Sequence, residues 1–78
     1  MDWQLNRDLN QWEASTGTWR AVVAQLHASE WYPYVQRIEP PHERYDGPSC
    51  EGALEGRIWC KAKIAELVGG EPRPGGAT

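Results

Sequence analysis

Two cysteines and two histidines are the residues of this 78-residue chain best suited to do chemistry. Ten positions separate Cys50 from Cys60, so on one helix they would stand about 15 Å apart, beyond the reach of a disulfide. We therefore expect two free thiols. A zinc site would also need His27 or His42, and no two of these four residues show the short paired spacing of zinc ligands, so we predict no metal site.

The remaining nucleophiles do not form a catalytic pattern. None of the three serines lies in a nucleophile elbow, and no glycine-rich loop is present to cradle a phosphate. Two lysines follow Cys60 closely and would lower the pKa of an exposed thiol, but its place in a row of small residues predicts that it is buried. We expect a protein that is not an enzyme, with no catalytic residue and no cofactor.

Composition predicts a small folded domain with an aromatic core. Leu, Ile and Val number only twelve and Phe is absent, but five Trp and three Tyr supply large apolar surfaces. The net charge of -3, with only eight scattered basic residues, is not typical of a general nucleic-acid binder. No apolar run is long enough to span a membrane, and the first residues do not resemble a secretory signal, so we expect a cytoplasmic protein.

Local patterns predict three strands followed by one helix, an α+β fold. The strands are expected at about residues 9–15, 18–26 and 31–38, as an antiparallel meander, and the helix at about 50–68 with Ser49 as its N-cap. The segment 18–26 also fits a helical pattern, and the need of the next strand for a neighbour favours the strand. Pro33 lacks an amide donor, which predicts a strand start or a sheet edge.

Two stretches rich in Pro and Gly punctuate these elements. Residues 39–49 are expected to form a long loop. Residues 69–78 are expected to form a disordered tail, because this segment carries no apolar side chain larger than Pro that would offset the entropy of ordering. The chain is thus expected to hold one domain, residues 1–68, and a tail.

The predicted helix carries two apolar stripes. We expect the first, which is made mostly of small residues, to pack on the sheet; its members are Ala53, Gly56, Cys60, Ile64 and Leu67. The second would remain partly exposed and mark an interface. Its simplest occupant is the same stripe of a second copy, so we predict a homodimer through Leu54, Ile58, Lys61, Ala62 and Ala65.

The segments Gly17–Val23 and Trp31–Val35, followed by a helix carrying Trp59 and Cys60, resemble small uncharacterised proteins of bacteria and their phages. The resemblance covers roughly residues 9–68 and implies a three-stranded meander followed by one helix. A similar element order occurs in HicB-like antitoxin domains and in double-stranded-RNA-binding domains. The resemblance implies no particular activity. A compact acidic protein can occupy a site meant for nucleic acid, as small phage inhibitors of host defence complexes do, so an anti-CRISPR-like inhibitor is the most concrete function that we predict.

Trp, Tyr and Arg crowd two neighbouring predicted strands, and these residue types are enriched in binding hot spots. A core without Phe would also have to use them, so both interpretations stay open. An acidic surface over residues 39–55 offers a second contact. The candidate partner-binding residues are Arg20, Trp31, Tyr32, Tyr34, Arg37, Glu43, Asp46 and Trp59. We predict a protein-binding module, with a nucleic-acid-binding or antitoxin-type regulator as the alternative.

Overall fold

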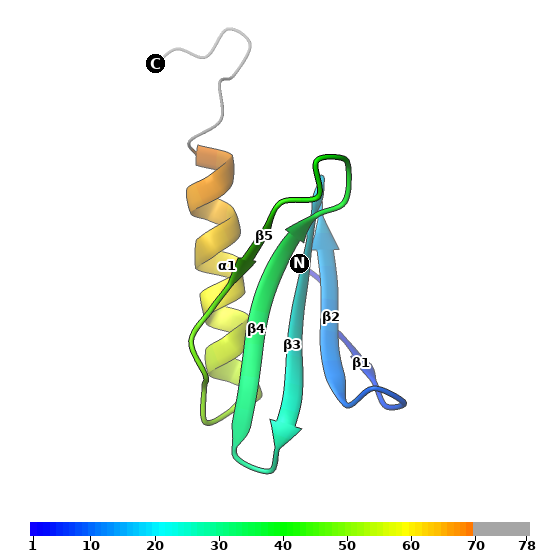
Figure 1. Cartoon of the computed structure of the whole chain (residues 1–78), viewed down its shortest axis with the longest axis vertical. Helices are drawn as coiled ribbons and strands as arrows, with labels where there is room; N and C mark the ends of the chain where they lie inside the picture. Colours follow the sequence, from blue (N-terminus) through cyan, green and yellow to red (C-terminus); the bar gives the residue numbers. More distant parts are fainter. Residues whose placement is uncertain (70–78) are drawn as a thin grey trace, which may run out of the picture.

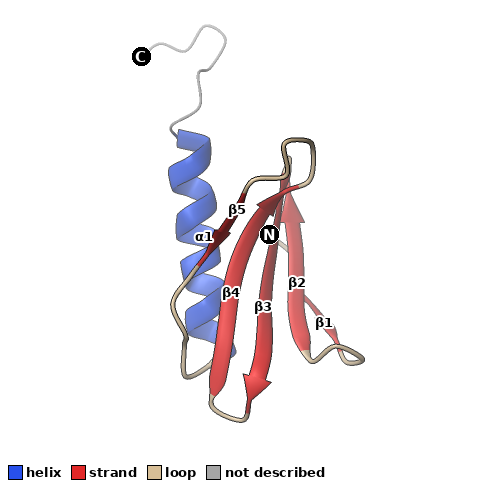
Figure 2. Ribbon diagram, in the orientation of Figure 1, coloured by secondary structure: helices blue, strands red, loops and turns tan. Residues whose placement is uncertain are grey.

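The computed structural model describes residues 1–69 and arranges them as an antiparallel sheet with one helix packed against it (Figure 1). The strands are β1 (Gln4–Asn6), β2 (Gln11–Thr16), β3 (Trp19–His27), β4 (Glu30–Arg37) and β5 (Arg44–Asp46). They lie side by side in chain order, and the helix α1 (Ala53–Gly69) follows the last of them (Figure 2). The predicted α+β class is confirmed, but the sheet has five strands in place of three. Apart from Gly69, which ends α1, the predicted tail lies outside the described residues.

The three longest strands correspond to the three that the sequence predicts. β2 and β3 pair from Gln11↔Ala24 to Thr16↔Trp19 and are joined by a tight turn. Gly17 adopts a φ of 57° there, which glycine accepts without steric cost. The helical alternative for residues 18–26 is wrong, because β3 is hydrogen-bonded on both sides, to β2 and to β4.

The two edge strands are the elements that the sequence does not predict. β1 and β5 have three residues each, Gln-Leu-Asn and Arg-Tyr-Asp, so neither shows an alternation long enough to recognise. The predicted loop over 39–49 is therefore wrong in part, since it contains β5. Tyr45 in β5 pairs with Val35 and packs against the core, which holds this short strand on the sheet.

The helix begins three residues later than predicted, and Ser49 is not its N-cap. Cys50 instead forms a β-bridge with Trp31, in which each backbone amide donates to the other residue's carbonyl at 2.8 Å. Because these bonds hold Cys50 extended, the chain turns helical only after Gly52. Ser49 Oγ donates to Glu30 Oε1 at 3.4 Å.

Pro33 lies in the middle of β4, where it is fully buried, and not at a strand start. Its carbonyl accepts a hydrogen bond from the amide of Gly47 at 2.8 Å, just beyond the end of β5. The side on which proline lacks a donor therefore faces the segment that follows β5. No regular strand ladder runs there, so the missing amide is tolerated.

The core lies between α1 and the sheet. Its buried members are Trp19, Ala21, Val23, Val35, Cys60 and Ile64. Gly56 sets the distance between the layers, because a Cβ at this position would lie 2.6 Å from Val23 Cγ1. The first predicted helix stripe thus packs on the sheet, with Gly56, Cys60 and Ile64 buried. Within residues 1–69 no helix is long and apolar enough to cross a membrane.

Candidate protein-binding surface

The second helix stripe lies on the side of α1 that faces away from the sheet. Leu54 is 62% exposed and Ile58 is 60% exposed, although both are large apolar side chains. The stripe's other members, Ala62 and Ala65, are exposed as well, and so is Lys61, the remaining predicted dimer residue. The predicted dimer residues therefore form one continuous exposed face, whatever occupies it.

A groove of about 200 Å³ runs beside this face, where the N-terminal segment passes the helix. The groove is lined by Trp3, Leu54, Arg57, Ile58 and Lys61. Three of these residues are apolar and two are cationic. Sequence reasoning missed the part played by Trp3, because no local pattern places a residue of the N-terminal segment against a helix fifty positions later.

The two cations of the groove have no acidic partner among the described residues, unlike Arg20, Arg44 and Lys63, which form salt bridges. The Arg57 guanidinium lies 4.8 Å from the centroid of the Trp12 ring, which fixes its position without neutralising it. Within residues 1–69, neither Arg57 nor Lys61 forms a salt bridge. By contrast, Arg20 pairs with Glu13 at 3.4 Å and Arg44 pairs with Asp46 at 2.8 Å.

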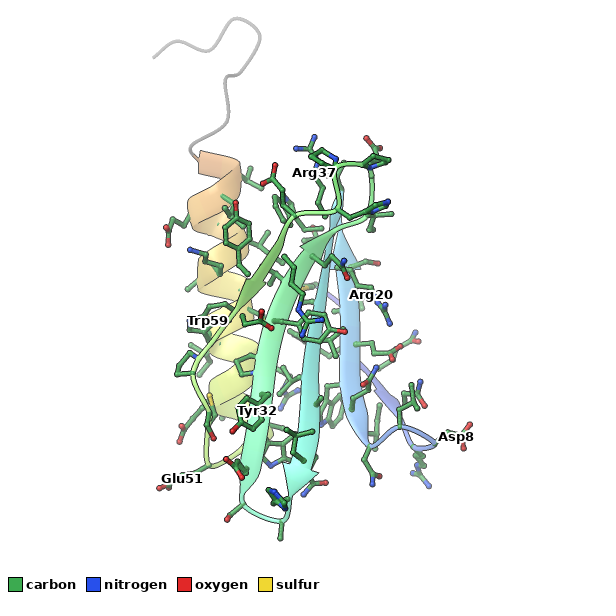
Figure 3. The ribbon with its side chains drawn as sticks, in the orientation of Figure 1. Asp8, Arg20, Tyr32, Arg37, Glu51 and Trp59 are labelled. Atoms are coloured by element: carbon green, nitrogen blue, oxygen red, sulfur yellow. The ribbon has the colours of Figure 1, made fainter. Side chains whose placement is uncertain are left out.

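The structure divides the candidate partner-binding residues between two faces. Strand alternation places Arg20, Tyr32, Tyr34 and Asp46 on the face of the sheet that carries no helix. Trp31, Arg37 and Trp59 lie on the helix side, and Glu43 lies in the segment before β5. Figure 3 shows this separation, with Tyr32 over β4 and Trp59 projecting from α1.

Polar side chains on the helix-free face are largely engaged with one another. The Arg44 guanidinium lies 3.8 Å from the centroid of the Tyr34 ring, and Tyr32 Oη donates to Glu30 Oε1 at 2.7 Å. That bond to a carboxylate raises the pKa of Tyr32. Asp46 is held by Arg44, so part of the predicted acidic surface is neutralised internally.

Glu13 belongs to the same helix-free face. Its carboxylate accepts hydrogen bonds from the side chains of Gln11 and Asn6, in addition to its pairing with Arg20. The bond from Gln11 is the largest cause of the lowered pKa of Glu13. The polar side chains of this face therefore bind mainly to one another.

Trp59 and Trp31 have structural contacts that account for their presence. Both pack against the core cluster and are only partly exposed. Trp59 lies directly over the backbone of Gly47, where an added Cβ would come within 2.7 Å of the indole and 2.8 Å of the Pro33 ring. The absence of a side chain at Gly47 allows this indole to close the edge of the core.

The two thiols are free, as predicted, and neither is activated. Cys60 is fully buried, and burial raises its pKa to about 12. Burial also raises the pKa of Cys50, with a smaller contribution from Glu55. Both groups are protonated at neutral pH and are therefore poor nucleophiles. Among the described residues, no cluster of three or more His, Cys, Asp or Glu side chains is placed to hold a metal ion.

Comparison with protein-family models, curated proteins and solved structures gave no match. The resemblance to small phage and bacterial proteins stays a prediction, and function has to be argued from the surface itself.

Proposed function

We propose that this chain is a non-enzymatic protein-binding domain whose contact surface is the outward face of α1 together with the groove beside it. The observation that carries the proposal is the exposure of Leu54 and Ile58 at about 60% each, next to an apolar groove. Apolar side chains that cluster on a surface and adjoin a hollow are typical of interaction sites. The inward side of the same helix already supplies the contact that folding needs.

The chemistry of the remaining residues supports this assignment over catalysis. Cys60 is the best-placed nucleophile by sequence, but it is buried and protonated. A phage-encoded inhibitor of a host defence complex is the narrower version of the proposal. It is supported by the predicted acidic surface over residues 39–55, in which Glu43 and Glu51 are exposed and form no salt bridge within residues 1–69.

The alternative, a nucleic-acid-binding regulator that uses the sheet, has less support. Tyr34 is the natural stacking platform of the helix-free face, but Arg44 already covers its ring. On this face Arg20 and Arg44 are both paired with carboxylates, so neither is free to bind phosphates there. An electrophoretic mobility shift at low salt tests this alternative, and we expect no shift with DNA or RNA.

Site-specific photo-cross-linking tests the proposal directly. A photoreactive residue is placed at Ile58 in one variant and at Leu26 in another, which is also 60% exposed but lies in β3 and does not line the groove. Expressed in the native host, the position 58 variant should yield a discrete cross-linked protein and the position 26 variant should not. Equal cross-linking from both positions, or none from either, would contradict a binding site on this face.

A further inference from the structure

The floor of the groove determines the kind of side chain that fits it. Trp3, Leu54 and Ile58 present apolar surface around a hollow of about 200 Å³. An apolar cavity of about 150 Å³ is large enough for a benzene ring, so this hollow has room for one aromatic or branched aliphatic side chain. The occupant must therefore offer at least one large apolar group.

The rim determines the charge of the occupant. Arg57 and Lys61 line the same groove as the apolar residues, and neither forms a salt bridge within residues 1–69. Glu55, the nearest acidic residue along the helix, projects about 160° away from Arg57 around the helix axis. Bringing a neutral or cationic partner here would desolvate two charges without compensation, whereas carboxylates would form charge-assisted hydrogen bonds with them.

Resting on the proposed protein-binding function, we infer that the partner presents an acidic amphipathic helix, whose apolar side chain enters the groove while its carboxylates pair with Arg57 and Lys61. Leu54, Ile58 and Lys61 recur at spacings of four and three, so the exposed face runs along the axis of α1 for about 10 Å. A helix laid along this face meets it with side chains at matching spacing, as in other helix-in-groove complexes.

Two occupants from the same chain fit less well. Residues 70–78 contain no apolar side chain larger than Pro, so they offer nothing to fill the groove. In a two-fold dimer with the groove on the axis, each cation would meet the cations of the second copy. The small side chains of Ala62 and Ala65 would also leave the hollow unfilled.

Three synthetic peptides of about 14 residues, or four helical turns, test the inference. They share one face of Leu and Trp, and differ only in flanking residues that are Glu, Gln or Lys. Titration calorimetry at about 0.15 M salt should show the Glu peptide binding at least about three-fold more tightly than the Gln peptide, and the Lys peptide most weakly. Amide resonances of residues 54–61 and the Trp3 indole resonance should shift in the nuclear magnetic resonance spectrum.

Matched variants distinguish binding in the groove from nonspecific electrostatic or hydrophobic binding elsewhere on the surface. Ile58→Glu should weaken binding of the Glu peptide by at least about ten-fold, whereas Leu26→Glu, at an equally exposed position, should not. Lys61→Glu should narrow the preference for the Glu peptide over the Lys peptide by at least about three-fold. Arg20→Glu makes the same change in net charge on the helix-free face and should leave that preference intact. Thermal unfolding of each variant confirms that it is folded.

Several outcomes would overturn the inference. Equal affinity for the three peptides would show that Arg57 and Lys61 do not select an acidic partner. If Ile58→Glu leaves peptide binding unchanged, the groove is not the binding site. If light scattering shows that the parent protein is a dimer and that Ile58→Glu is a monomer, the occupant of the groove is a second copy of this chain. If no peptide binds but position 58 still cross-links to a protein in the host, the partner's chemistry is wrong and the protein-binding function stands.

Discussion

The two sides of α1 contain similar amounts of apolar sequence but have opposite surroundings. On the inner side, Gly56, Cys60 and Ile64 are buried against β3 and β4. On the outer side, Leu54 and Ile58 are the largest apolar groups, and both are exposed. The size contrast is sharpest in the first two turns, where Gly56 on the inner side is flanked by the large Leu54 and Ile58 on the outer side. The missing side chain of Gly56 is what allows the helix to approach Val23 closely.

This comparison predicts that stability depends on the inner side and partner binding on the outer side. The largest effect is expected for Ile64→Ala, which removes a side chain that is only 5% exposed from the core. We expect the free energy of unfolding to fall by about 2–4 kcal/mol, from lost burial and the cavity left behind. Urea denaturation measures it, and a loss below about 1 kcal/mol would mean that α1 is not firmly docked.

Gly56→Ala should have the next largest effect. The new Cβ would meet Val23 Cγ1, and Val is stiff about χ1, so the helix must move outward. Overpacking of this kind costs about 1–3 kcal/mol, and the better helix propensity of Ala recovers about 1 kcal/mol. In a Val23→Ala background the penalty should disappear. Gly69→Ala, with nothing within 4 Å of the new Cβ, is the matched control and should be close to neutral.

Cys60, on the inner side of α1, makes the free energy of unfolding depend on pH in the alkaline range. Its folded pKa of about 12 is above the unfolded value of 9.0, so the folded state keeps a proton that the unfolded state loses. Stability is therefore full below about pH 9 and falls as the pH rises from 9 towards 12. Between about pH 8 and pH 10 we expect a loss of about 1 kcal/mol from this group. Cys60→Ala should reduce this loss of stability with rising pH, as measured by urea denaturation at each pH. If the loss is the same in the variant, other groups cause it.

Ile58→Ala should have the smallest effect on stability. The side chain is 60% exposed and contacts no core residue, so the free energy of unfolding should change by less than about 0.5 kcal/mol. Thermal unfolding measures it. A loss comparable to that of Ile64→Ala would show that the outer side is part of the fold, and the distinction between the two sides would be lost.

The sequence predicts the helix-facing pattern and the three long strands because these features repeat over many residues. It does not predict β1 and β5, because three-residue strands form only once a neighbouring strand offers its edge. The later start of α1 has a similar origin, since the extended conformation of Cys50 depends on Trp31, nineteen positions earlier. The exposed stripe was predictable from helical spacing, but the groove was not. Trp3 reaches it through the sheet pairing of the strand that follows it.

The order of the strands also bears on how fast the chain folds. Every strand pairs with its neighbours in sequence, so the sheet can form from successive hairpins with short loop closures. The helix is different, because the Cys60 thiol reaches the carbonyl of Val22 across 38 positions. Docking of α1 is thus the step of high contact order. Substitutions at Gly56 and Ile64 should mainly accelerate unfolding, whereas changes in the β3–β4 hairpin should slow folding.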